Sequence, residues 1–146
     1  MGKMERWKER LKSYSKALFQ LESALRQKQF SVLEKDGVIK RFEFTFELAW
    51  KTLQDKLYDE GYLTTKGPKP VIKQAFKNGM ITDGQAWMDM LTDRNNSTHL
   101  YDESAAVSIF DRIQITYFKL LQELKLALVE EQKMLTRFQQ TLLNFK

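Results

Sequence analysis

The sequence of 146 residues contains no cysteine and only one histidine. Without cysteine the chain forms no disulfide, offers no thiolate to a metal and has no cysteine nucleophile. A single histidine leaves zinc with mostly carboxylate ligands, so we expect no zinc site, and no other metal or cofactor. There is no apolar run of about 18 residues and no signal-peptide pattern, so we expect a cytoplasmic protein that does not bind membranes.

Proline and glycine are also scarce, with two and six residues, which leaves room for long uninterrupted helices. With 42% hydrophobic and 29% charged residues, the composition is that of a globular rather than a disordered chain. The length fits one domain with its own core over residues 1–146. The net charge of +5 permits contact with RNA or an acidic partner but requires neither, and DNA binding is not expected.

Apolar residues recur at helical spacing almost everywhere in the sequence. The spacing predicts long helices over 7–25 and 38–57, a loop over 61–70, a short helix closed by residues 78–79, and another helix before residue 93. Ser31 with Glu34, and Thr82 with Gln85, have the spacing of capping boxes that begin helices. We therefore predict an all-α fold, an up-and-down antiparallel four-helix bundle with one short extra helix and a long C-terminal helix.

From Asp102 onward one apolar register continues to Phe145, interrupted only by Gln114 and Glu131. A continuous helix of about 45 residues would be roughly 65 Å long, about twice the length of a compact bundle of this size. The segment 125–146 is therefore expected either to fold back or to project as a helical arm. An exposed apolar stripe on such an arm would need a partner.

The stretch DRNNSTHLYDE, residues 93–103, contains the single histidine. Arg94 precedes His99 by five positions and Tyr101 follows it by two, an arrangement expected by chance about once in several hundred sequences. On a helix, positions i and i+5 point about 140° apart. Arg94 and His99 could therefore act on one group only if the helix ends within NNST or a second protomer completes the site, which favours a dimer.

A purely structural interpretation of the same residues stays open. Arg94 could pair with Asp93 or Glu103, His99 could hydrogen-bond a backbone carbonyl, and Tyr101 could be a core aromatic. On α-helical spacing Glu43 and Glu47 share one face, and Glu47 could orient Arg41 or Lys51.

Two stretches, RFEFTFELAWKTL (41–53) and DRNNSTHLYDE (93–103), resemble the nucleotidyltransferase substrate-binding protein family of the HEPN superfamily. The resemblance extends from about Trp7 to Leu124, and the tail from Lys125 lies outside it. It implies a helical bundle that forms a homodimer and a separate minimal nucleotidyltransferase as partner. It also implies a metal-independent ribonuclease, like the HepT-like toxins of toxin–antitoxin pairs, with an arginine, a polar residue and a histidine as catalytic residues. Arg94, Asn95 and His99 fill these positions, and Tyr101 fills that of the tyrosine that accepts AMP from the partner.

These side chains suit RNA cleavage, in which the 2′-hydroxyl of the RNA is itself the nucleophile. His99 can move a proton near pH 7, and Arg94 can stabilise charge on the phosphate oxygens. Asn95 could hold the substrate or the histidine tautomer. A nucleotide on Tyr101 would block RNA sterically and by charge repulsion.

Three functions therefore remain for the sequence. The first is a ribonuclease toxin silenced by modification of Tyr101. The second is a non-catalytic subunit that presents substrate to the nucleotidyltransferase, with the same motif as a phosphate or nucleotide pocket. The third is a helical adaptor that uses its C-terminal arm, and the sequence does not decide whether the chain is an enzyme.

Overall fold

The computed structural model describes residues 4–97 and 102–145, with only the backbone described at residues 4 and 5. Within these ranges the chain is helical and contains no strand, which confirms the predicted all-α bundle. The helices are α1 (Met4–Leu25), α2 (Val32–Asp59), α3 (Pro68–Lys77), α4 (Gly84–Ser97), α5 (Glu103–Arg112) and α6 (Phe118–Asn144), with a π-helical turn η1 (Ile113–Tyr117) joining the last two. In the described part of the chain, no helix has the length and apolar content needed to cross a bilayer.

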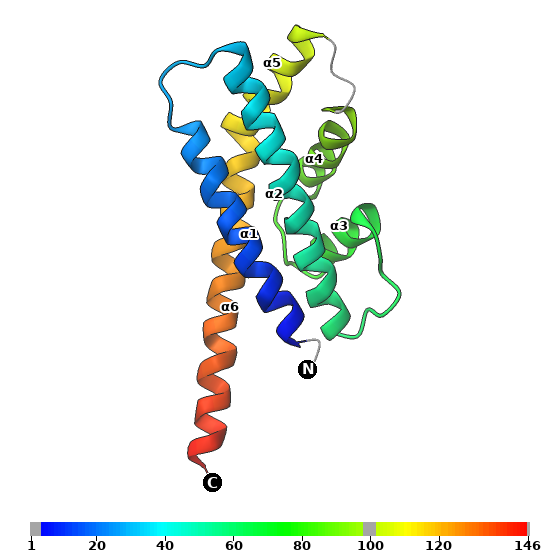
Figure 1. Ribbon diagram of the computed structural model, residues 1–146. Helices are drawn as coiled ribbons and strands as arrows, with labels where there is room; N and C mark the ends of the chain where they lie inside the picture. Colours follow the sequence, from blue (N-terminus) through cyan, green and yellow to red (C-terminus); the bar gives the residue numbers. More distant parts are fainter. Residues whose placement is uncertain (1–3, 98–101, 146) are drawn as a thin grey trace.

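Helix α2 is the centre of the bundle and contacts α1, α3, α4 and α5 (Figure 1). Its inner face carries Phe42, Phe46, Leu53 and Leu57, none of which is exposed to solvent. Its first turn is closed by the predicted capping box, in which Ser31 accepts from the Glu34 amide and the Glu34 side chain accepts from the Ser31 amide. These two hydrogen bonds fix where α2 begins.

Helices α5, η1 and α6 run as one column behind α1 and α2 (Figure 1). The predicted long helix is therefore present, and its two apolar interruptions have structural explanations. At the first, the π turn widens the helix, so that Ile113 and Tyr117 are both buried while Gln114 faces solvent. At the second, Glu131 accepts from Lys56 of α2 at 2.7 Å.

The start of α4 differs from the prediction. Helix α4 begins at Gly84, and the Asp83 side chain, not Thr82, accepts from the amide of Ala86 at 3.0 Å. The predicted capping box of Thr82 and Gln85 is thus wrong, since Gln85 donates to Asp89 within the helix at 2.9 Å. A side chain at Gly84 would meet the Phe76 ring at 2.9 Å, so α3 and α4 approach closely there.

Candidate functional site

The end of α4 carries the first two residues of the predicted site and is fixed to the bundle by Asp93. The Asp93 carboxylate is buried and accepts two hydrogen bonds from Arg112, at 2.7 and 2.9 Å, and one from the Tyr117 hydroxyl at 2.5 Å. Burial and the Asp93 hydrogen bond raise the pKa of Tyr117, and the same carboxylate raises the pKa of Arg112. Since Arg112 and Tyr117 belong to α5 and η1, this cluster ties α4 to the long helical column.

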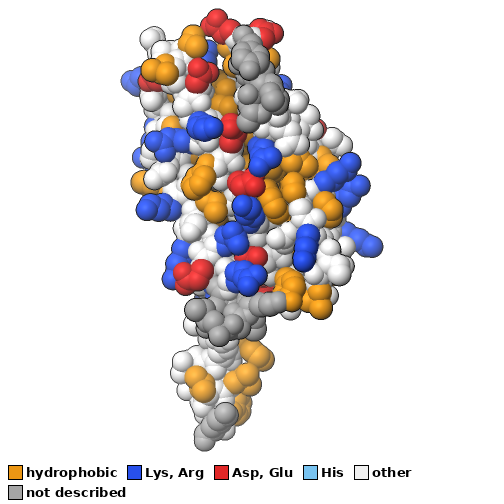
Figure 2. Space-filling model, turned by 45° about the vertical axis from the view of Figure 1, so that its right-hand side comes forward, with side chains coloured by type: hydrophobic (Ala, Val, Ile, Leu, Met, Phe, Trp, Pro, Cys, Tyr) orange, Lys and Arg blue, Asp and Glu red, His pale blue; other side chains and the backbone are white. Residues whose placement is uncertain are grey.

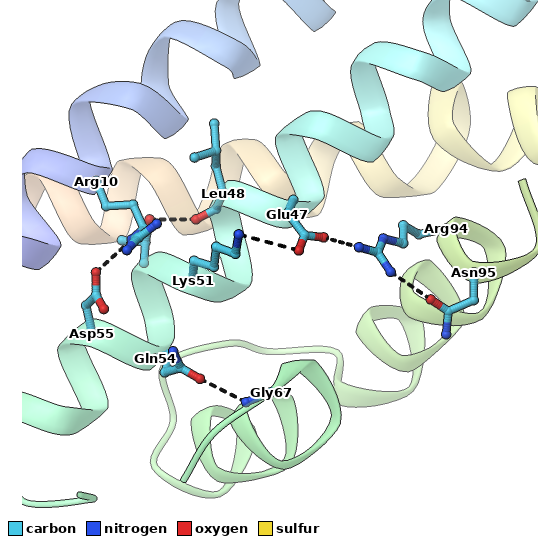
Figure 3. Close-up of polar contacts among 10 residues, drawn as sticks. Arg10, Glu47, Leu48, Lys51, Gln54, Asp55, Gly67, Arg94 and Asn95 are labelled. Atoms are coloured by element: carbon cyan, nitrogen blue, oxygen red, sulfur yellow. Dashed lines mark hydrogen bonds and ion pairs between the residues drawn. The ribbon is translucent and has the colours of Figure 1, made fainter. Parts of the chain in front are cut away.

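Because Asp93 is bonded to Arg112 and Tyr117, Arg94 pairs instead with a carboxylate of α2. One guanidinium nitrogen of Arg94 lies 2.5 Å from the Glu47 carboxylate of α2, and another donates to the Asn95 side chain at 3.0 Å (Figure 3). Glu47 also lies 3.7 Å from Lys51 (Figure 3). The sequence-based pairing of Arg94 with Asp93 is therefore wrong, whereas the expected contact of Glu47 with Lys51 is present.

Arg94 and Asn95 lie at the edge of a groove of about 670 Å³ between α1, α2 and α4. The Arg94 side chain keeps 37% of its surface exposed, so it is held in place and still reachable from solvent. The groove is lined by Ala17, Gln20, Lys40, Arg41, Glu43, Phe44, Glu47, Arg94 and Asn95.

The lining of the groove combines three cations and two carboxylates with one exposed aromatic ring. Phe44 of α2 is 60% exposed, so one face of its ring is open to the groove. Arg41 is held by Gln20 of α1 at 3.2 Å, and Lys40 lies 3.8 Å from Glu43. An aromatic face beside guanidinium and ammonium groups can take a planar base and a phosphate together.

The other two residues of the predicted site, His99 and Tyr101, lie outside the described residues, so the structure does not test their positions. The chain on both sides of them is defined. The Ser97 hydroxyl donates to the Arg94 carbonyl at 2.8 Å at the end of α4, and the Asp102 side chain accepts from the Ser104 amide at the start of α5.

Sequence reasoning did not assign Phe44, Lys40 or Arg41 to the site, and it gave Glu47 a partner other than Arg94. One available signal was Phe44 itself, which stands outside the main apolar stripe of its helix. A second was the position of Lys40, Phe44 and Glu47, which lie three or four residues apart and so share one helix face.

Comparison with known proteins connects these features to a family. A family model described as nucleotidyltransferase substrate binding protein like matches residues 9–130. Among curated proteins, a probable ribonuclease HepT of Haemophilus influenzae is 30% identical over 81 residues, which is 53% of this chain and 56% of that relative. The chain thus aligns with little more than half of the length of that relative.

Two solved structures share the fold. A protein from Thermus thermophilus is 34% identical with a TM-score of 0.70, over 76% of this chain and 94% of the other. A protein from Haemophilus influenzae, described as revealing the fold of a substrate binding domain of a nucleotidyltransferase, is 25% identical. It superposes with a TM-score of 0.67 over 79% of this chain and 96% of the other.

Proposed function

Because this chain belongs to the nucleotidyltransferase substrate binding protein like family, we propose that it is the HEPN-type subunit of a two-component system. Its partner in this proposal is a minimal nucleotidyltransferase. The subunit acts as a metal-independent ribonuclease of toxin type, and transfer of a nucleotide to Tyr101 silences it. The observation that carries the proposal is the partly exposed Arg94 guanidinium, oriented by Glu47 at the edge of a groove that Lys40 and Arg41 also line, five residues before the only histidine.

Each residue has a defined part in the proposed cleavage. His99 accepts the proton of the RNA 2′-hydroxyl, whose oxygen attacks the adjacent phosphorus, and the 5′-oxygen leaves with a proton returned from an acid. Arg94 donates to the phosphate oxygens as their charge grows. Asn95, already bonded to Arg94, supports the orientation of that guanidinium.

The groove supports RNA as the substrate. Phe44 offers a face for stacking a base, and Lys40 and Arg41 offer cations to the backbone phosphates on either side. Because the family resemblance implies a homodimer, we further propose that two copies of the chain contribute to one site. A nucleotide on Tyr101, two residues from His99, would add negative charge where the RNA phosphate must bind.

The second candidate is a non-catalytic subunit that presents substrate to the nucleotidyltransferase. Two observations favour it: one guanidinium edge of Arg94 is already occupied by Glu47, and one structural relative is described as a substrate binding domain. In this case the groove binds a nucleotide or phosphate without turning it over.

The test separates these candidates with one preparation. Protein expressed without the nucleotidyltransferase is checked by intact mass for an added nucleotide and is then incubated with total tRNA in EDTA. His99→Ala and Arg94→Ala are compared with Arg26→Ala, which removes an exposed arginine on α1's C-terminal side, outside the groove. All variants are first shown to be folded by circular dichroism.

Cleavage in EDTA that is lost in His99→Ala and Arg94→Ala but kept in Arg26→Ala supports the ribonuclease. If folded, unmodified wild-type protein leaves tRNA intact, the ribonuclease proposal fails. Nucleotide binding that depends on Arg94 would then support the substrate-presenting subunit.

A further inference from the structure

The lower half of α6 extends beyond the rest of the bundle (Figure 1). Leu128 is the last fully buried residue of the helix, and the Lys56–Glu131 ion pair is its last described contact with α2. Beyond Leu128, every described side chain of α6 is at least partly exposed. We call residues 132–145 the arm.

The arm lies outside the part of the chain that the family shares. The family model stops at residue 130. The two structural relatives are covered over 94% and 96% of their own lengths, yet they cover only 76% and 79% of this chain. A partner that recognises the shared fold can therefore bind without contacting the arm.

The arm nevertheless continues the apolar seam of the bundle. Above it, Leu121, Leu124 and Leu128 are buried at alternating steps of three and four residues. The same alternation continues through Leu135, Phe138, Leu142 and Phe145 on the arm. A seam with this mean spacing of 3.5 residues packs against another helix as in a coiled coil.

Leu135 is partly buried against the core, and beyond it the seam is exposed. Phe138 is 62% and Phe145 is 84% exposed, and Leu142 is also more than half exposed. In Figure 2 most of the hydrophobic side chains that are visible on the arm lie along its right-hand edge. A continuous apolar stripe of this kind marks an interaction surface.

The positions of the charged residues on the arm favour an identical helix as the partner that packs on the seam. The positions that flank the seam are uncharged, and they are occupied by Gln132, Met134, Gln139 and Thr141. The two charged residues of the arm, Lys133 and Arg137, lie away from the seam by helical geometry. Flanking charges normally select a different partner or repel an identical one, and neither effect operates here.

The exposed area is also sufficient for a pair of arms. A buried aromatic side chain covers about 150–250 Å², so the exposed parts of the seam side chains amount to roughly 500 Å² in each chain. Two copies would then bury about 1,000 Å², the lower limit for a specific interface.

We propose that the arm is a self-association element, which pairs along this seam with the arm of a second copy of the chain. This contact is separate from the groove and from any pairing of the bundles. Its small area makes the association reversible and dependent on protein concentration.

The first test is sedimentation of the full-length protein, without RNA or nucleotidyltransferase, over a wide concentration range. Phe138→Glu and Leu142→Glu each place a carboxylate in the seam, whereas Gln140→Glu places the same charge on the opposite face. We expect both seam variants to lose one association step, with at least about tenfold weaker association, and Gln140→Glu to match the wild type. Equal association of the seam variants and the wild type would overturn the proposal, as would a wild type that shows no association at all.

The second test uses the absence of cysteine, which makes any introduced thiol the only one in the chain. Phe138 lies midway along the arm, so its position meets itself in a symmetric pair of either orientation. Phe138→Cys should form a disulfide-linked dimer on mild oxidation, and Gln140→Cys on the far face should not. Equal cross-linking of the two variants would show random collision and would contradict the pairing.

Discussion

At the scale of single residues, the candidate site depends on a carboxylate that is 47 positions away from the arginine it orients. Arg94 and Glu47 meet because α2 and α4 pack together, and their contact is 2.5 Å long. In the sequence, Arg94 was singled out by its spacing from His99, and Asn95 was assigned through the family resemblance. The sequence could not identify Glu47 as the partner of Arg94, because that pairing is set by the rotation of two helices about their axes.

The first prediction concerns the orientation of Arg94. Glu47→Gln replaces a charge-assisted hydrogen bond with a neutral one, which weakens the hold on the guanidinium by about 1.5 kcal/mol. We expect the single-turnover rate of tRNA cleavage to fall by about tenfold, with little change in tRNA binding.

Lys51→Met is the matched control for this prediction, because Lys51 contacts the same carboxylate but not Arg94. Its cleavage rate should stay within about twofold of the wild type. A faster rate in Glu47→Gln would mean that the carboxylate competes with RNA phosphate for Arg94, contrary to the positioning role.

The second prediction concerns Asp93, which joins α4 to the long column. Asp93→Ala leaves Arg112 and the Tyr117 hydroxyl without their buried acceptor. Loss of one partner from a fully buried pair costs about 3–5 kcal/mol, but the Arg112 side chain is 45% exposed, so we expect about 2 kcal/mol.

Urea denaturation measures this loss directly. Asp89→Ala removes an exposed aspartate one turn earlier on the same helix, and its free energy of unfolding should change by less than about 0.5 kcal/mol. Similar changes in the two variants would show that the buried hydrogen bonds of Asp93 contribute little to stability.

At the scale of elements, the helix boundaries show where sequence reasoning succeeds and where it fails. The capping box of Ser31 and Glu34 was predictable because both of its residues are local and the next helix is strongly apolar. At α4 the sequence offers two capping residues in succession, Thr82 and Asp83, and it is the second that accepts from the Ala86 amide. The π turn could not be predicted. In the sequence it corresponds to a single polar residue, Gln114, within an apolar register, and such an interruption does not specify a π turn.

The third prediction tests the start of α2. Ser31→Ala removes the side chain that accepts from the Glu34 amide at 3.1 Å. The free energy of unfolding should fall by about 1 kcal/mol, because an amide of the first turn loses its acceptor. Ser13→Ala, at an exposed position inside α1, is the control, and it should be neutral or slightly stabilising. An unchanged urea midpoint in Ser31→Ala would mean that solvent replaces the cap fully.

The fourth prediction concerns the junction of α1 and α6. The buried Tyr14 hydroxyl donates to the Leu121 carbonyl, and burial raises the pKa of Tyr14 well above its ordinary value of 10.0. The folded state therefore keeps this proton more strongly than the unfolded state does. Its contribution to stability is complete below about pH 10 and is lost as the pH rises through the folded pKa.

Tyr14→Phe removes both the hydrogen bond and the titration. At pH 7 it should lower the free energy of unfolding by about 1 kcal/mol. Above pH 10 the variant should lose stability less steeply than the wild type, so that the two unfolding curves converge. Parallel pH profiles, measured by thermal unfolding between pH 7 and 11, would contradict the buried phenol as the cause.

At the scale of the whole molecule, the all-helical bundle was predictable because helical periodicity runs through nearly the entire sequence. The length of the last helix was also predictable, since one register continues from Phe110 to Phe145. The choice between folding back and projecting was not. It depends on where the bundle of α1 and α2 stops. Beyond the Lys56–Glu131 ion pair, Leu135 is the last hydrophobic side chain of α6 that packs against the core.

The fifth prediction follows from the separation of the groove and the arm. The groove lies between α1, α2 and α4. The arm is the C-terminal part of α6 and extends away from these helices (Figure 1). Mutations at sites this far apart with no shared partner act independently. We therefore expect Arg94→Ala to lose tRNA cleavage and keep the arm-dependent association step, and Phe138→Glu to show the reverse.

The double variant Arg94→Ala/Phe138→Glu should show the sum of both losses, measured by sedimentation and by cleavage in EDTA on the same preparations. Binding of the nucleotidyltransferase should survive in Phe138→Glu, because the family fold that would recognise it ends at residue 130. If Phe138→Glu also abolishes cleavage in a folded protein, arm pairing and catalysis are coupled. The second copy would then be held at the groove by the arm, and the two surfaces would form one assembly.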